Sequence, residues 1–68
     1  MKALSKRELA ILYGYKNGMK NKHIAEELGI EQKTVGTYVS RAKEKLGLEK
    51  DDNVYLTVVT AIEKGLLI

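Results

Sequence analysis

The chain has 68 residues and a formal net charge of +3, with no cysteine and a single histidine. This length predicts one small domain, and these residue types exclude a disulfide framework and argue against a structural or catalytic metal site. No apolar run approaches the roughly 18 residues of a membrane span, and no signal peptide opens the chain. We therefore expect a cytoplasmic protein that needs no cofactor and no membrane.

Positive charge is concentrated in the first two-thirds of the chain. Residues 1–19 carry four basic and one acidic side chain, and residues 29–48 carry four basic and two acidic ones, whereas residues 49–68 carry two basic and four acidic ones. An anionic partner is therefore expected to bind the first two-thirds. A net charge of +3 also fits an ordinary solvated surface, so charge alone does not establish nucleic-acid binding.

The first predicted helix covers about residues 6–17. Ser5 and Glu8 have the spacing of a capping box, and Asn17 followed by a glycine is a stop signal. Gly14 weakens the helix interior by up to about 1 kcal/mol relative to alanine. A close contact with another helix at Gly14 would explain this glycine.

Two helices, expected at about residues 21–28 and 32–46, follow with only a tight turn between them. Ala25 is small enough for two helices to cross closely, Gly29 tolerates the positive φ of a sharp turn, and Val35 can lock the second helix onto the first. This pattern is typical of a helix-turn-helix, in which the second helix enters a DNA major groove.

The last helix is expected at about residues 53–64, between a polar cap at 51–53 and a glycine. Its β-branched residues make a strand the competing local prediction, but the caps and the three preceding helices favour a fourth helix and an all-α fold. The helix has two adjacent apolar faces, and one of them is enough to cover the core. The first face comprises Val54, Val58, Ala61 and Ile62, and the second comprises Tyr55, Val59, Ile62 and Leu66.

This helix has more apolar residues than one buried face requires, and we expect the surplus to pair two copies of the chain. The alternative is that the tail at residues 66–68 folds back and covers the surplus. The expected dimer interface comprises Val54, Tyr55, Val58, Val59, Ile62 and Leu66.

Several motifs, in this order, resemble the DNA-binding domain of LuxR/GerE-type bacterial transcription regulators. The segments are residues 4–8 (LSKRE), 18–28 (GMKNKHIAEEL), 34–39 (TVGTYV), 45–47 (KLG) and 61–66 (AIEKGL). Each would be weak alone, but together they extend over nearly the whole chain. The resemblance implies a four-helix domain whose third helix contacts DNA and whose fourth helix often pairs two copies.

The chain departs from the family pattern at positions that bear on DNA contact. Gly36 stands where the family commonly has a DNA-contacting lysine, and Tyr38 stands where it commonly has histidine. Lys20 and Glu31 replace the serines that usually begin the second and third helices, and the loop at 51–52 is acidic. These departures affect the target sequence more than the fold. We expect the backbone at Gly36 to approach another group closely.

Candidate DNA contacts lie on the outward face of the third helix and at the start of the second. Short side chains let a helix lie deep in the groove, arginine can contact guanine or phosphate, and helix N-termini favour anions. The alternative for these residues is an ordinary solvated side chain, except for Thr34, whose hydroxyl could instead satisfy a local backbone group. The expected DNA-binding residues are Lys20, Asn21, Lys22, Lys33, Thr34, Gly36, Thr37, Ser40 and Arg41.

We therefore expect a small bacterial or phage-type transcription regulator that binds double-stranded DNA sequence-specifically, as a homodimer on an inverted repeat. The alternative is an adaptor that uses the same fold to bind RNA polymerase or another regulator. An enzyme is not expected, because the chain has no glycine-rich phosphate loop and no plausible catalytic pair. His23 has no second metal-type ligand nearby and is expected at the surface.

Overall fold

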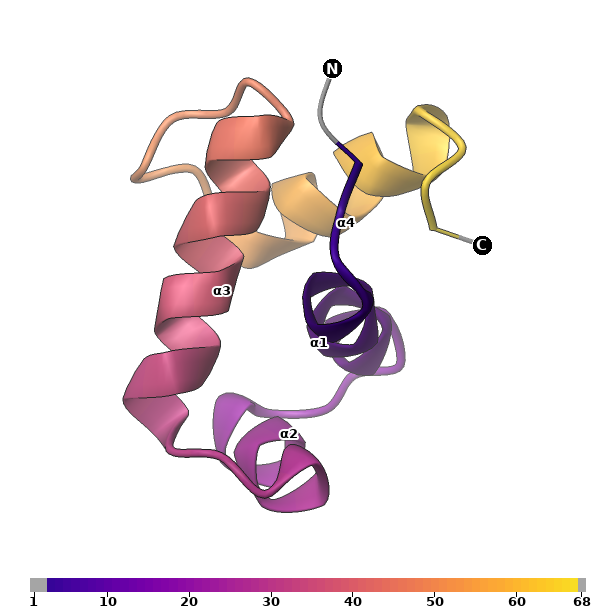
Figure 1. Cartoon of the computed structure of the whole chain (residues 1–68). Helices are drawn as coiled ribbons and strands as arrows, with labels where there is room; N and C mark the ends of the chain where they lie inside the picture. Colours follow the sequence, from indigo (N-terminus) through magenta and orange to yellow (C-terminus); the bar gives the residue numbers. More distant parts are fainter. Residues whose placement is uncertain (1–2, 68) are drawn as a thin grey trace.

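The computed structural model describes residues 3–67 and contains four helices joined by short loops (Figure 1). They are α1 (Lys6–Lys16), α2 (Asn21–Leu28), α3 (Gln32–Lys45) and α4 (Val54–Glu63). The predicted all-α fold is confirmed, and each helix end lies within one residue of its predicted position. The small differences arise because residues that were counted in the predicted helices are capping residues in the structure. Asn17 and Leu46 are the C-caps of α1 and α3, and Asn53 is the N-cap of α4.

The helix α1 occupies the centre of the domain and packs against the other three helices. In Figure 1 it is seen end-on, with α3 along the left side, α2 below it, and α4 above and to the right. Its start has the predicted capping box, in which the Ser5 hydroxyl accepts from the Glu8 amide at 3.2 Å and the Glu8 carboxylate accepts from the Ser5 amide at 2.9 Å. This reciprocal pair satisfies two amides that a helix start otherwise leaves without partners.

An ion pair ties the start of α1 to the end of α3. Lys45 Nζ lies 2.9 Å from Glu8 Oε1, and the Glu8 side chain is only 2 % exposed. Burial alone raises the pKa of Glu8, but the hydrogen bonds from Lys45 and the Ser5 amide outweigh it and hold that pKa below its ordinary value. Glu8 is therefore a buried structural carboxylate as well as a cap.

The core has two clusters, one on each side of α1. The first joins α1 to the end of α3, to α4 and to the chain ends, and contains Leu4, Leu12, Ala42, Leu46, Val58, Ala61 and Leu67. The second joins α1 to α2 and the first half of α3, and contains Ile11, Ile24, Ala25, Val35 and Val39. The second cluster is the one that fixes the angle between α2 and α3.

The glycine in the middle of α1 has the predicted cause. A Cβ built on Gly14 would lie 2.8 Å from Cγ1 of Ile24, which is buried in α2. Since real Cβ atoms do not approach other atoms that closely, a larger residue at position 14 would force the buried Ile24 side chain to shift. Gly14 thus allows Ile24 of α2 to pack closely against α1.

The helix α4 buries only part of its predicted apolar surface. Its buried residues are Thr57, Val58 and Ala61, whereas Ile62 is 40 % exposed. Thr57 can be buried at little cost, because its hydroxyl donates to the Asn53 carbonyl at 3.3 Å. Of the two apolar faces expected for this helix, the one with Val58 and Ala61 covers the core, and Ile62, which belongs to both faces, is exposed.

The burial of Val58 corrects the predicted dimer interface. Val58 is only 5 % exposed and belongs to the core, so it has no surface to offer a partner. Leu66 and Val54 are partly buried against the two core clusters. The tail does fold back, with Leu67 in the core, while its last residue, Ile68, lies outside the described residues.

Candidate nucleic-acid interface

The junction between α2 and α3 has the geometry of a helix-turn-helix. Gly29 ends α2 in the left-handed conformation, with φ +66° and ψ 35°. The chain then turns so that the Ile30 amide donates to the Ala25 carbonyl at 3.0 Å. Ala25 is 3 % exposed and Val35 is fully buried, so the three predicted positions have the predicted packing and backbone roles. They hold α3 against α2 by its inner face and leave its outer face free.

The outer face of α3 is exposed along the whole helix. It lies at the left edge of the molecule in Figure 1, away from α1 and α4. Thr34 is the exception among the α3 candidates, because its side chain is half-buried. The exposed residues are Lys33, Gly36, Thr37, Ser40, Arg41 and Glu44. We refer to these six residues as the outer face of α3.

Hydrogen bonding restricts what Thr37 can do on this face. Its Oγ1 donates to the Lys33 carbonyl at 3.1 Å, one turn earlier in the same helix. The hydroxyl proton is therefore engaged, while the oxygen lone pairs and the methyl group remain available. In this rotamer, Thr37 is suited to accept from a base amino group or to contact a thymine methyl rather than to donate to phosphate.

Arg41 lies over the ring of Tyr38, with its guanidinium carbon 5.7 Å from the ring centre. Tyr38 is itself half-buried against the cluster that joins α2 and α3. A cation held over an aromatic face is attracted to it and loses some of its rotamer freedom. The sequence prediction missed this contact, although the i, i+3 spacing of Tyr38 and Arg41 on a helix was a visible signal.

The start of α2 presents a less uniform surface than expected. Lys20 and Lys22 are exposed, and Lys20 gives α2 no side-chain cap. Asn21 is half-buried, and its Oδ1 accepts from the Tyr15 hydroxyl at 3.2 Å. Desolvation by burial raises the pKa of Tyr15, so this phenol stays protonated as the donor. Asn21 is thus tied to α1, whereas the two lysines are free to face a partner.

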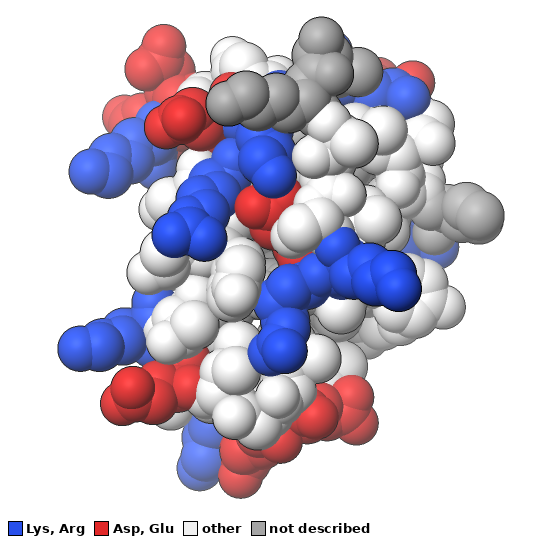
Figure 2. Space-filling model, viewed as in Figure 1, with Lys and Arg blue, Asp and Glu red and all other residues white. Residues whose placement is uncertain are grey.

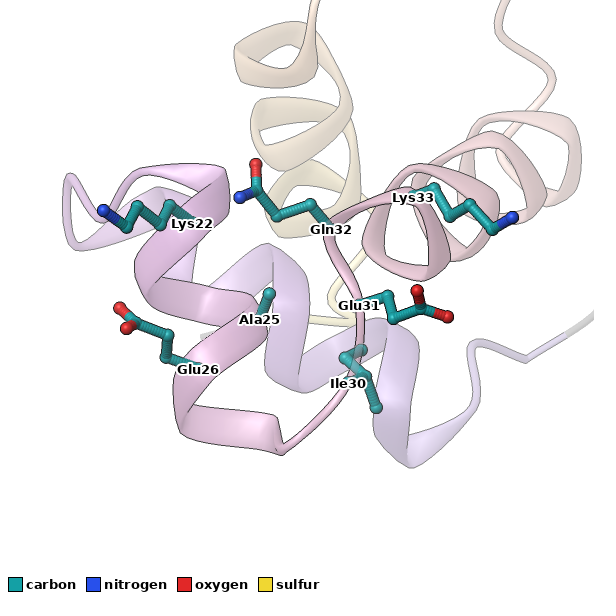
Figure 3. A pocket seen from close by; sticks show the side chains of 7 residues that line it. All are labelled: Lys22, Ala25, Glu26, Ile30, Glu31, Gln32 and Lys33. Atoms are coloured by element: carbon teal, nitrogen blue, oxygen red, sulfur yellow. The ribbon is translucent and has the colours of Figure 1, made fainter.

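A hollow of about 520 Å³ opens beside the turn, between α2 and the start of α3 (Figure 3). Two lysines and two glutamates line it, and in Figure 3 Lys22 and Lys33 extend in opposite directions, one on each side of it. Its lining residues are Lys22, Ala25, Glu26, Ile30, Glu31, Gln32 and Lys33. Because both signs of charge are present, the hollow is not by itself an anion site.

The distribution of charge over the surface follows the predicted trend in part. Figure 2 shows basic side chains along the α3 edge and over α1, whereas the lower end carries mostly acidic side chains with a basic one among them, and further acidic side chains lie at the upper left. Within residues 3–67 no group of acidic, cysteine and histidine side chains could hold a metal ion, and His23 is exposed. None of the four described helices has the length and apolarity to cross a membrane.

Comparison with known proteins decides the family. Residues 2–58 match the family of bacterial regulatory proteins known as the luxR family. The chain belongs to this family. It is therefore a LuxR-type helix-turn-helix domain of DNA-binding transcription regulators, and this family is not one of enzymes.

Two relatives show the extent of the similarity. A putative transcriptional regulator of Pseudomonas aeruginosa PAO1 is 46 % identical over 46 residues, which are 68 % of this chain and 22 % of that protein. The crystal structure of the response regulator ChrA, from a heme-sensing two-component system, matches 98 % of this chain with a TM-score of 0.86 and 33 % identity. This match covers 32 % of the ChrA chain. The matched part thus makes up about a fifth of the first relative and about a third of the second.

Proposed function

We propose that this LuxR-type chain binds double-stranded DNA sequence-specifically, with α3 in the major groove, and regulates transcription in the bacterial cytoplasm. The outer face of α3 is the observation that carries the proposal. It is exposed over the full helix, and its side chains are short in the middle and cationic at Lys33 and Arg41. A helix of this shape fits a groove about 12 Å wide, with its middle close to the bases and its long cations able to contact guanine or phosphate.

The residues proposed to contact DNA fall into two groups. Lys33, Thr37, Ser40 and Arg41 would make base and phosphate contacts from α3, while Lys20 and Lys22 would bind phosphate from the start of α2. Thr34 and Asn21 are secondary candidates, because both are half-buried.

A homodimer that binds an inverted repeat is the second element of the proposal. Tyr55, Val59 and Ile62 share one side of α4 at helical spacing and are 60 %, 49 % and 40 % exposed. An exposed apolar stripe of this kind is typical of a protein interface. A two-fold pair formed through α4 would place two α3 helices on half-sites about 34 Å apart, one turn of DNA.

The test is a selection of bound sequences from a random duplex pool, followed by binding measurements over a range of salt concentrations. We expect the selection to recover an inverted repeat. The logarithm of the binding constant should fall linearly with the logarithm of the salt concentration, with a slope that reports the number of phosphate contacts. The double substitution Thr37→Ala with Arg41→Ala should remove the sequence preference. Recovery of no motif from the unsubstituted chain, with only weak binding, would contradict the proposal.

A protein-binding adaptor is the second candidate, and a particular surface favours it. An apolar groove runs between α1 and the C-terminal segment, on a different part of the molecule from the outer face of α3. It is lined by Lys6, Leu9, Ala10, Tyr13, Leu66 and Leu67. RNA polymerase or another regulator is the partner class expected there. A chain that selects no DNA motif but binds polymerase would support this candidate over the first.

A further inference from the structure

Gly36 has no structural reason to be glycine within this chain. It lies inside α3 with a negative φ, so its backbone conformation suits any residue. A Cβ built on it would meet no described atom within 4 Å beyond its chain neighbours and its own helix backbone. The sequence-based expectation of a close approach at Gly36 is therefore wrong for contacts inside the domain.

The other glycines of the chain each have a cause in the structure. Gly14 lies against Ile24, at a distance that leaves no room for a Cβ. The remaining four adopt positive φ values from +66° to +79°, which L side chains rarely do, and they are Gly18, Gly29, Gly47 and Gly65. Gly36 differs from all of them, because alanine there would favour the helix without any steric conflict.

We propose that Gly36 allows the floor of the DNA major groove to approach the α3 backbone more closely than a Cβ would permit. This inference rests on the proposed function, and it assigns Gly36 a role in specificity. The neighbouring outward residues Thr37 and Ser40 are too short to contact base edges unless the helix lies deep. The Thr37 hydroxyl donates a hydrogen bond to the Lys33 carbonyl of the same helix, so this side chain stays close to the helix surface. Gly36 thus sets the depth on which the contacts of both neighbours depend.

This role predicts a separation between specific and nonspecific binding. Nonspecific binding depends on phosphate contacts, which long lysine and arginine side chains make without deep insertion of the helix. A methyl group at position 36 should therefore weaken binding to the selected site and leave nonspecific affinity and the salt dependence nearly unchanged. A loss of folding would weaken both.

The experiment compares Gly36→Ala with Gly14→Ala, the same substitution inside another helix. Gly36→Ala should raise Tm by about 2–8 °C through helix propensity and lower affinity for the selected site by about five- to a hundredfold. Its affinity for a random duplex should change by less than about twofold. Gly14→Ala should lower Tm, because of its conflict with Ile24, and keep the affinity for the selected site at temperatures where circular dichroism shows it folded.

Each outcome decides between the hypotheses. If Gly36→Ala raises Tm and binds the selected site as tightly as the unsubstituted chain, no close approach occurs and the role of Gly36 is overturned. An equal loss on selected and random duplexes would also overturn it. If the unsubstituted chain selects no DNA sequence, the proposed function fails and this inference fails with it.

Discussion

The outer face of α3 and the exposed stripe of α4 are both uncovered helix surfaces, but their chemistry is opposite. The first combines Gly36 and short polar side chains with two cations and the carboxylate of Glu44, whereas the second consists of Tyr55, Val59 and Ile62. Water solvates the first face well, so its exposure needs no explanation from stability. The apolar stripe gains free energy when a partner covers it, by about 25 cal/mol for each Å² removed from water. We therefore propose different kinds of partner for the two faces.

The largest expected effect comes from a substitution that disrupts the apolar stripe of α4 and leaves the outer face of α3 intact. Val59→Asp places a charge in the centre of the α4 stripe and should abolish self-association. Affinity for an inverted repeat should fall by about 10²-fold or more, since the second half-site no longer binds in the same complex. Affinity for an isolated half-site should stay within about twofold. Sedimentation and titrations of both duplexes measure these effects.

The control for this substitution is Lys64→Gln, which lowers the net charge by the same one unit just after α4. It should leave self-association and DNA binding nearly unchanged. If Val59→Asp binds the full inverted repeat as tightly as the unsubstituted chain, α4 is not the dimer interface and the apolar stripe has another partner.

The next effect concerns Arg41, the cation in the C-terminal half of the outer face of α3. Arg41→Ala should weaken binding to the selected site by about 1–3 kcal/mol, because an arginine that contacts a base or a phosphate is lost. Arg41→Lys separates the two kinds of contact. Lysine restores a phosphate contact but not a bidentate contact with guanine, so persistent loss of preference at one base pair indicates base recognition.

Much of the architecture was predictable because local residues determine it. The caps at Ser5 and Asn53 and the turn at Gly29 act within a few residues of the chain, so their spacing in the sequence was sufficient. The sequence left open which face of α4 is buried, because Ile62 belongs to both apolar faces and hydropathy favours its burial over that of Thr57. Packing of α4 on α1 and α3 decides that choice, and the Asn53 carbonyl satisfies the buried hydroxyl of Thr57.

The candidate site was predictable as a face but not as a set of contacts. Helical spacing alone identified the exposed positions of α3. The engagement of the Thr37 hydroxyl and the contact between Arg41 and Tyr38 depend on rotamers, which spacing does not determine. The open space around Gly36 could likewise be recognised only from the positions of α1 and α2, which leave this side of α3 uncovered.

A smaller effect concerns the stability of the fold, through the buried Glu8 that joins α1 to α3. The folded-state pKa of Glu8 is below its usual 4.5. As pH falls through the range between the two pKa values, the unfolded chain therefore binds more protons at Glu8 than the folded chain does. The stabilisation by Glu8 is present above about pH 4.5 and is lost as pH falls through the folded pKa. Glu8→Gln should lower the free energy of unfolding at pH 7 by about 1–3 kcal/mol and flatten its dependence on pH below 4.5. Urea unfolding at several pH values measures this, and unchanged stability at pH 7 would contradict it.

The smallest expected effect concerns the ring beneath Arg41. An exposed cation–aromatic contact contributes about 0.5–1 kcal/mol, and Tyr38 exerts this effect on DNA only by holding the guanidinium. Tyr38→Phe keeps the ring face and should bind the selected site like the unsubstituted chain. Tyr38→Leu keeps apolar bulk but removes the ring, and should bind about two- to fivefold more weakly. In an Arg41→Ala background, exchanging Phe for Leu at position 38 should have no effect on DNA affinity. A persistent difference there would show that residue 38 acts on DNA directly or through the packing of α3, not through Arg41.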